Sequence, residues 1–133
     1  MKESAMADSR KIDIKIETEV QFIPEQSDES AGRYVFAYTI TITNAGNVAA
    51  QLISRHWLIR DAEGHEQEVR GLGVVGEQPL LKPGQSFEYT SGTAIATPVG
   101  TMRGSYQMVT EDTGEKFDAP IAEFILSIPR VLH

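Results

Sequence analysis

The chain has 133 residues, a net charge of −7 at pH 7 and no cysteine, and these properties exclude several classes of protein. A chain of this length suits one domain that buries roughly two-thirds of its unfolded surface, so it needs no covalent crosslink. Without cysteine there can be no disulfide, thiolate metal site or cysteine nucleophile. The acidic charge disfavours duplex nucleic acid and membrane surfaces as partners, because both repel an acidic protein.

The N-terminal region carries no targeting or folding signal. No apolar run approaches the roughly 18 residues of a transmembrane helix, and the first residues lack the apolar stretch of a signal peptide. We therefore expect a cytoplasmic protein. Residues 1–10 show no hydrophobic pattern and are predicted to be a flexible tail, followed by one domain over residues 11–133.

Alternation with period two is the strongest signal along the chain. Between residues 11 and 22 the even positions are mostly apolar and the odd positions mostly charged, and residues 33–43 alternate again. Only a strand places alternate residues on opposite faces. Residues 48–60 form a third predicted strand with a less regular pattern. Turn-forming residues separate further predicted strands at 67–75, 86–90, 102–109 and 116–126. Short strands at this spacing predict an all-β sandwich or barrel of about seven or eight strands.

Several segments together resemble the bacterial ApaG family. They are Gln51 to Trp57, Val69 to Pro79, Leu81 to Gly84, Tyr89 to Gly92, Gly100 to Tyr106 and Phe117 to Phe124. The resemblance runs in order from about residue 12 to residue 126. It implies a fibronectin type III/immunoglobulin-like β-sandwich, a role in binding partners, and an association with cobalt resistance and magnesium efflux. It implies no chemical reaction.

The segment Gly71-Leu72-Gly73-Val74-Val75-Gly76 fits the pattern G-x-G-x-x-G. Such glycines can let backbone N–H groups approach phosphate oxygens, and the family has been discussed as a pyrophosphate binder for this reason. A dinucleotide fingerprint requires a helix after the glycines, but Glu77-Gln78-Pro79 begins none. Two interpretations remain open: an anion-binding loop at Gly71, Gly73 and Gly76, or a sharply twisted strand end that needs glycine for its backbone.

The sequence Arg55-His56-Trp57 has a structural and a chemical interpretation. On a strand, Trp57 and His56 face opposite ways, and we expect Trp57 in the core. His56 has no second histidine at ligand spacing, so we expect no metal site and no cofactor. The acidic group around Gly114 is predicted to be a solvated hairpin tip. No catalytic motif is present, and we expect a protein that is not an enzyme.

Two functions from different classes therefore remain. The first is a non-enzymatic module that binds an unidentified protein through the stretch from Gly71 to Leu81. Its apolar anchors are Val74, Val75, Leu80 and Leu81, where they are exposed. The alternative is a binder of pyrophosphate or a dinucleoside polyphosphate through the loop from Gly71 to Gly76. The alternative requires converging cations, and the nearby candidates in sequence are Arg55, Arg70 and Lys82.

Overall fold

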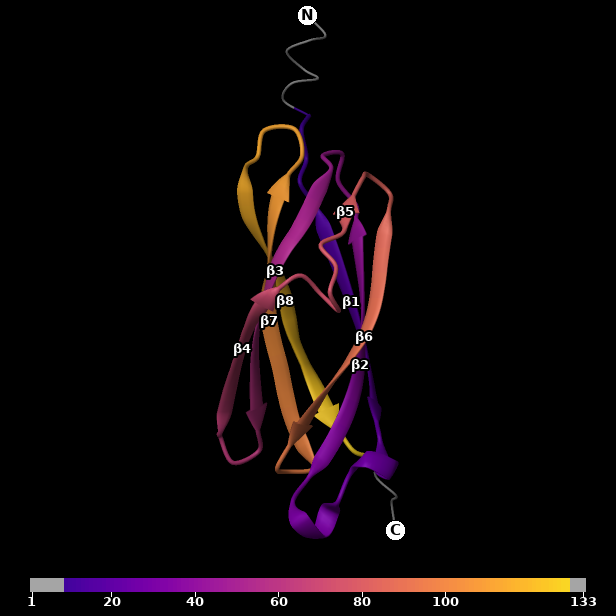
Figure 1. Ribbon diagram of the computed structural model, residues 1–133, viewed down its shortest axis with the longest axis vertical. Helices are drawn as coiled ribbons and strands as arrows, with labels where there is room; N and C mark the ends of the chain where they lie inside the picture. The colour runs from indigo at the N-terminus through magenta and orange to yellow at the C-terminus, as the bar shows by residue number, and fades with distance from the viewer. Residues whose placement is uncertain (1–8, 130–133) are drawn as a thin grey trace, which may run out of the picture.

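The computed structural model describes residues 9–129, which form two antiparallel sheets packed face to face (Figure 1). The smaller sheet has the order β1-β2-β6, and the larger has the order β4-β3-β7-β8 with β5 paired to β3. The predicted β-sandwich is confirmed, and its elements are β1 (Ile14–Phe22), η1 (Pro24–Gln26), η2 (Glu29–Ala31), β2 (Tyr34–Asn44), β3 (Ala50–Asp61), β4 (Glu66–Leu72), β5 (Leu80–Leu81), β6 (Ser86–Ile95), β7 (Val99–Thr110) and β8 (Lys116–Ser127). No helix within residues 9–129 is long and apolar enough to cross a membrane.

Strand β4 ends at Leu72 rather than at the predicted residue 75, and β7 begins at Val99 rather than at residue 102. Two further differences concern β6 and β5. Strand β6 continues to Ile95, beyond the predicted end at Thr90, because residues 91–95 pair with the first half of β2. The two-residue strand β5 was not predicted, and it exists only because Leu80 and Leu81 lie beside the start of β3. Both differences arise from pairing with strands distant in sequence, which local propensity does not report.

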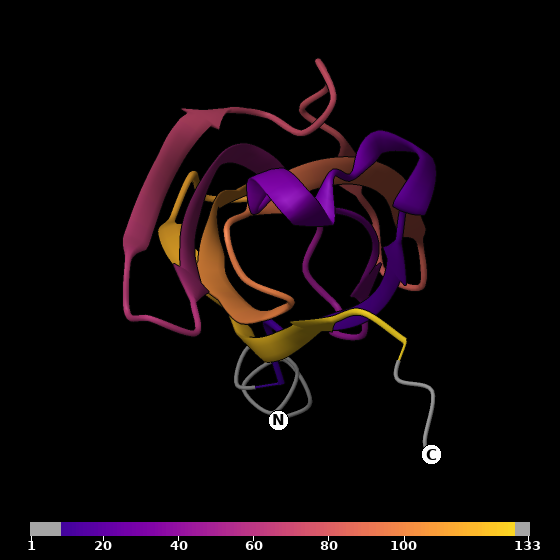
Figure 2. The ribbon, with the colours of Figure 1, turned by 90° about the horizontal axis from the view of Figure 1, so that it is seen from below.

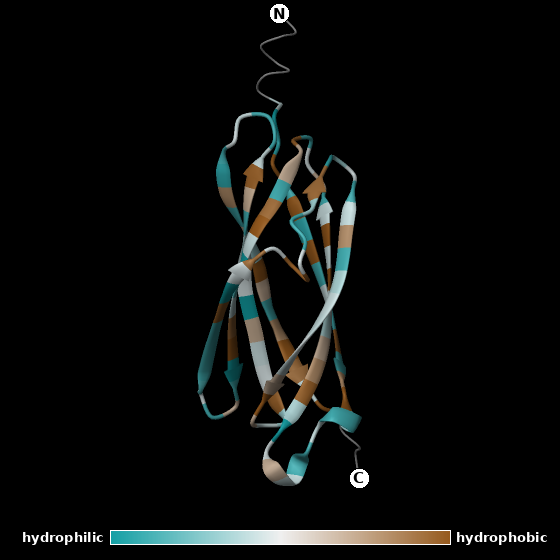
Figure 3. Cartoon of the chain, in the orientation of Figure 1, coloured by the Kyte–Doolittle hydropathy of each residue, from teal (hydrophilic) through white to brown (hydrophobic). Residues whose placement is uncertain are grey.

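Alternation in β2 places one row of large side chains between the sheets. Phe36, Ile40 and Ile42 are fully buried, and Tyr38 is nearly so. The threonines between them face outward, where Thr39 and Thr43 bond to hydroxyls of β6. The bands of alternating hydropathy along the strands in Figure 3 show the same division. The sequence-based assignment of faces in β2 is therefore confirmed.

A bulge explains the irregular pattern of the third predicted strand. In β3 the pairing with β7 shifts between Leu52 and Ser54, so Ile53 is an extra residue that has no paired residue on β7. One extra residue reverses the alternation of faces. Leu52 and Trp57 are therefore both buried although they are five positions apart.

The aromatic centre of the core spans both sheets. The ring of Trp57 lies 5.5 Å from that of Tyr38, 6.4 Å from that of Tyr106 and 5.9 Å from that of Phe124. The hydroxyls of Tyr89 on β6 and Tyr106 on β7 are 2.5 Å apart and join the two sheets. Burial raises the pKa of Tyr89 to about 12, so this hydroxyl pair stays neutral at physiological pH.

The N-terminal segment that precedes β1 is fastened to the β7–β8 hairpin. The predicted flexible tail extends to residue 10, but Arg10 donates hydrogen bonds to Asp112 (2.9 Å) and Glu115 (2.9 Å). The side chain of Asn47 also donates to the carbonyl of Ser9 (2.8 Å). Residues 9 and 10 thus contact the folded domain, and residues 1–8 lie outside the described part of the chain. Two carboxylates of the acidic hairpin tip, those of Asp112 and Glu115, therefore pair with the guanidinium of Arg10.

We expect Arg10→Gln to destabilise the protein slightly at neutral pH and much less in acid. Hydrogen bonds from Arg10 hold the pKa of Asp112 well below its usual range. A carboxylate with a lowered pKa stabilises the fold above about pH 4, and this contribution is lost as the pH falls further. Thermal midpoints of wild type and variant should therefore approach each other as the pH falls below about 4 toward the lowered pKa of Asp112. Arg33→Gln at another exposed arginine is the control, and a constant offset at every pH would contradict the prediction.

Candidate functional site

The segment between β4 and β5 is held rigidly by the bulge in β3. The carbonyl of the bulged residue Ile53 accepts hydrogen bonds from the N–H of Gly73 (2.8 Å) and from the side chain of Gln78 (2.9 Å). The N–H of Leu52 donates to the carbonyl of Pro79 (3.0 Å). The bulge therefore anchors both ends of residues 73–79, which we call the glycine loop.

The tip of the glycine loop is a tight turn over residues 74–77. The N–H of Val74 donates to the carbonyl of Glu77 (2.8 Å), and the N–H of Glu77 donates to the carbonyl of Val74 (2.9 Å). The central residues Val75 and Gly76 have φ values of 43° and 82°, as in the type I′ turns of β-hairpins. Because the N–H groups of Gly73, Val74 and Glu77 all bond within the protein, they cannot also cradle a phosphate.

The three glycines of the G-x-G-x-x-G pattern meet separate structural requirements. At Gly71 a Cβ atom would lie 2.8 Å from the guanidinium of Arg55, so glycine makes room for that side chain. Gly73 has a φ of 63°, and its missing Cβ leaves space for the carbonyl of Glu77. Gly76 occupies the turn with positive φ and an open surrounding. These observations favour the interpretation of the pattern as backbone geometry.

The predicted apolar anchors divide into two groups. Val75 is 55 % exposed and Leu80 is 37 % exposed, so both can meet a partner. Val74 and Leu81 are buried in the core, so these two residues do not meet the condition of exposure that the prediction set for them. On strand β5, Leu81 points inward because it alternates with the exposed Leu80. Leu72, which the sequence analysis did not select, is 75 % exposed at the end of β4.

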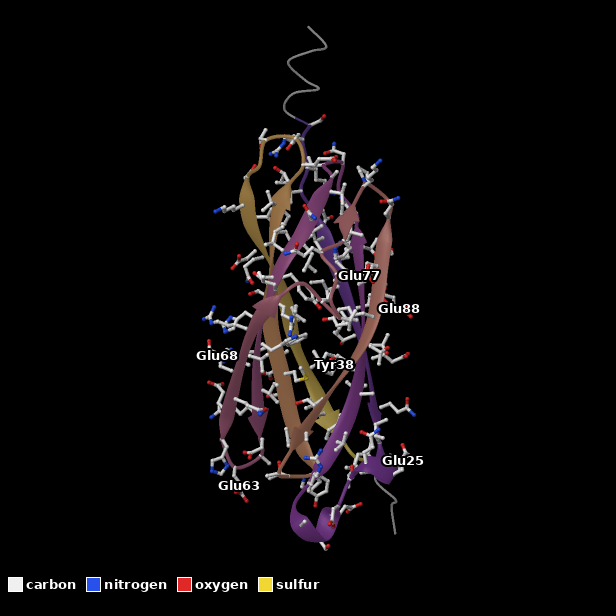
Figure 4. The ribbon with its side chains drawn as sticks, viewed as in Figure 1. Glu25, Tyr38, Glu63, Glu68, Glu77 and Glu88 are labelled. Atoms are coloured by element: carbon white, nitrogen blue, oxygen red, sulfur yellow. The ribbon has the colours of Figure 1, made fainter. Side chains whose placement is uncertain are left out.

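Of the cations proposed for anion binding, Arg55 and Arg70 line one open hollow with Gly71, but other groups of the protein already engage both. Arg55 donates to the carbonyls of Leu72 (3.1 Å) and Gly73 (2.9 Å) and so braces the start of the loop. Arg70 donates to Glu68 on the outer side of β4. Lys82 lies in the turn after β5. Figure 4 places the acidic side chain of Glu77 on the loop itself, where it opposes anion binding.

A histidine–carboxylate pair that the sequence analysis did not find lies on the outer face of the larger sheet. The Nε2 atom of His56 is 2.6 Å from a carboxylate oxygen of Glu68, and Arg70 bonds to the same oxygen at 2.9 Å. These bonds lower the pKa of Glu68, with the His56 bond as the largest cause. The pairing of β3 with β4 brings the residues together, and only the register of that hairpin could have revealed it. Residues 9–129 contain no cluster of three or more potential metal ligands.

Comparison with known proteins now places this geometry in a family. The family model described as the ApaG domain matches residues 24–110. The chain belongs to the ApaG family. It is 67 % identical over 128 residues to Protein ApaG of Nitrosospira multiformis, and 67 % identical over 128 residues to Protein ApaG of Thiobacillus denitrificans. In both comparisons the match covers 96 % of this chain and 100 % of the relative.

Solved structures agree with this membership. A crystal structure described as an ApaA protein from Bordetella pertussis is 56 % identical, with a TM-score of 0.88, and the match covers 92 % of this chain and 98 % of that one. The C-terminal domain of wzt shares the fold at a TM-score of 0.53 and only 10 % identity. The ApaG fold is thus shared at low identity, and the family name by itself specifies no reaction.

Proposed function

We propose that this ApaG domain is a non-enzymatic module that binds a protein partner through Leu72, Val75 and Leu80, which we call the apolar rim. All three side chains are exposed, and they belong to one segment of nine residues that the bulge of β3 holds in place. Apolar side chains on a preordered backbone lose little conformational entropy when they bind a partner. Cytoplasmic location and the family's association with cobalt resistance and magnesium efflux belong to the same proposal, with the partner as the link.

The backbone of Val75 is the observation that carries the proposal. A φ of 43° is unfavourable for a β-branched residue, and Val75 is the only non-glycine residue within 9–129 that adopts positive φ. Asparagine, aspartate or glycine would suit this turn position better. More than half of the valine side chain is also exposed, so its burial offsets little of the strain. A strained, exposed valine at the tip of a rigid turn suggests a role in contact with another molecule.

The alternative, a pyrophosphate or dinucleoside polyphosphate binder, has less support. The N–H groups of Gly73, Val74 and Glu77 bond within the protein, Arg55 is engaged with backbone carbonyls, and Glu77 adds a negative charge. An anion site needs donors and cations that are free to converge.

Val75→Asp should separate binding from folding. Asp-Gly is among the preferred pairs for a type I′ turn, so the variant should be as stable as wild type or more stable by up to about 1 kcal/mol. It should nevertheless lose the partner, because a charge replaces an apolar contact. The experiment is capture of cellular proteins with tagged wild type and variant, with quantification of each captured protein, and thermal melts in parallel.

Ile125→Asp is the matched control for the loss of binding. Ile125 is 63 % exposed on β8, far in sequence from the apolar rim, so this variant introduces the same charge on another exposed apolar residue. We expect a protein that wild type and Ile125→Asp retain and Val75→Asp loses. Equal capture by all three proteins would refute the proposed surface.

A further inference from the structure

Strand β4 extends beyond the sandwich as an edge with little cover. It pairs with β3 alone. Every residue of β4 is exposed except Val69 and Gly71, which are half-buried. In the view along the sandwich, β4 lies outside the ring that the other strands form (Figure 2). On the other side of the molecule β1 and β8 approach each other, so those two edges are partly covered.

The backbone of β4 offers alternate hydrogen-bonding groups to this edge. Two backbone hydrogen bonds flank the β3–β4 ladder, one from the N–H of Gly73 to the carbonyl of Ile53 and one from the N–H of Asp61 to the carbonyl of His65. Because bonded pairs alternate in antiparallel sheets, Gln67, Val69 and Gly71 bond to β3. The N–H and C=O groups that point away from β3 then belong to the residues Glu66, Glu68, Arg70 and Leu72.

We propose that two copies of the chain associate through antiparallel pairing of their β4 strands about Val69. In this register each Glu68 faces the partner's Arg70, and each Glu66 faces the partner's Leu72. The residues that face each other are those whose backbone groups point outward, so their hydrogen bonds complete the ladder. The two larger sheets join into one continuous sheet.

The charges along β4 complement those of a second, reversed β4 strand. This complementarity favours another copy of the chain as the partner and favours this register. The order acidic, apolar, basic at positions 68, 69 and 70 becomes self-complementary when one strand is reversed. Glu68 and Arg70 already share a face, with Oε2 and the guanidinium nitrogen 2.9 Å apart, so neither side chain must move to the other side of the sheet. His56 on β3 bonds to the same Glu68 oxygen from the side of β4 away from the free edge. Figure 4 shows Glu68 on the outer side of β4.

The proposed contact is small, so we expect a reversible dimer rather than a permanent one. Sedimentation equilibrium of the intact protein between about 10 μM and 1 mM should show a rising average mass. The proposed dimer contact and the apolar rim share Leu72, but a monomer could still present the rim to a partner, so the two proposals can fail separately. If the wild-type protein stays monomeric but still captures a cellular partner, only the inference of dimerisation is refuted.

Charge reversal tests the register directly. E68K places two positive pairs across the interface and R70E places two negative pairs, so each variant alone should associate at least about tenfold more weakly. An equimolar mixture of the two should form a heterodimer, because both facing pairs of positions 68 and 70 are again opposite in charge. E68K also changes the net charge from −7 to −5. A smaller net charge weakens the overall repulsion between two copies, so net charge alone predicts stronger association of E68K, whereas the proposed register predicts weaker association.

Glu63→Lys in the β3–β4 turn is the control, since it makes the same charge change outside the proposed pairing. It should leave association as in wild type, and circular dichroism should show that all variants are folded. A wild type that stays monomeric at about 1 mM would overturn the inference. So would E68K that associates as well as wild type, or a mixture of E68K and R70E that remains monomeric.

Discussion

Trp57→Ala should lower the free energy of unfolding by about 3–5 kcal/mol, the usual range for a large aromatic side chain removed from a packed core. Trp57 is 2 % exposed and contacts aromatic rings of both sheets. The alanine variant leaves a cavity between the sheets that backbone pairing on either side prevents from collapsing. Denaturant unfolding followed by circular dichroism measures the loss, because the variant lacks the only tryptophan.

His56→Ala is the appropriate comparison, because the two residues are adjacent on the same strand. Its bond to Glu68 lies on the outer face, where the side chain of Glu68 is 51 % exposed, so its loss should cost less than about 1 kcal/mol. The ratio of the two losses tests the assignment of faces after the bulge. A larger loss for His56→Ala would show that the outer face contributes more to stability than the core contact.

Gly73→Val should be the most damaging substitution in the glycine loop. The new side chain must adopt a φ of 63° and would collide with the carbonyl of Glu77, which closes the turn. Backbone strain and this collision together should cost at least about 2 kcal/mol. Gly76→Val has the same kind of backbone strain but an open surrounding, so it should cost less. Equal effects would mean that the loop relaxes around the added side chain.

The same loop decides between the two proposed ligand classes. We expect pyrophosphate to bind no more tightly than about 1 mM in titration calorimetry at low ionic strength, with or without magnesium, which corresponds to roughly 4 kcal/mol. The committed N–H groups and the overall charge of −7 are the reasons. Micromolar binding that disappears in a folded Gly73→Ala variant would instead favour the anion site and the alternative function.

The sequence by itself determined the class of fold and most of the buried face. Alternation identified the core row of β2 because a strand has only two faces, and one of them must exclude water. It also identified Trp57 as a core residue. The glycine pattern correctly marked the loop as unusual, but it could not distinguish a phosphate cradle from a turn, because both need positive φ.

Only the tertiary structure decided which residues of the loop reach solvent. The bulge at Ile53 reverses the alternation of β3 and anchors the glycine loop, and neither effect can be read from local propensity. The loop then buries Val74 and exposes Val75, although the two valines are neighbours of identical hydrophobicity. The pairing of His56 with Glu68 and the free edge of β4 likewise depend on strand register. Register depends on the exact turn and on which faces are buried, and a shift of one residue would change every facing pair.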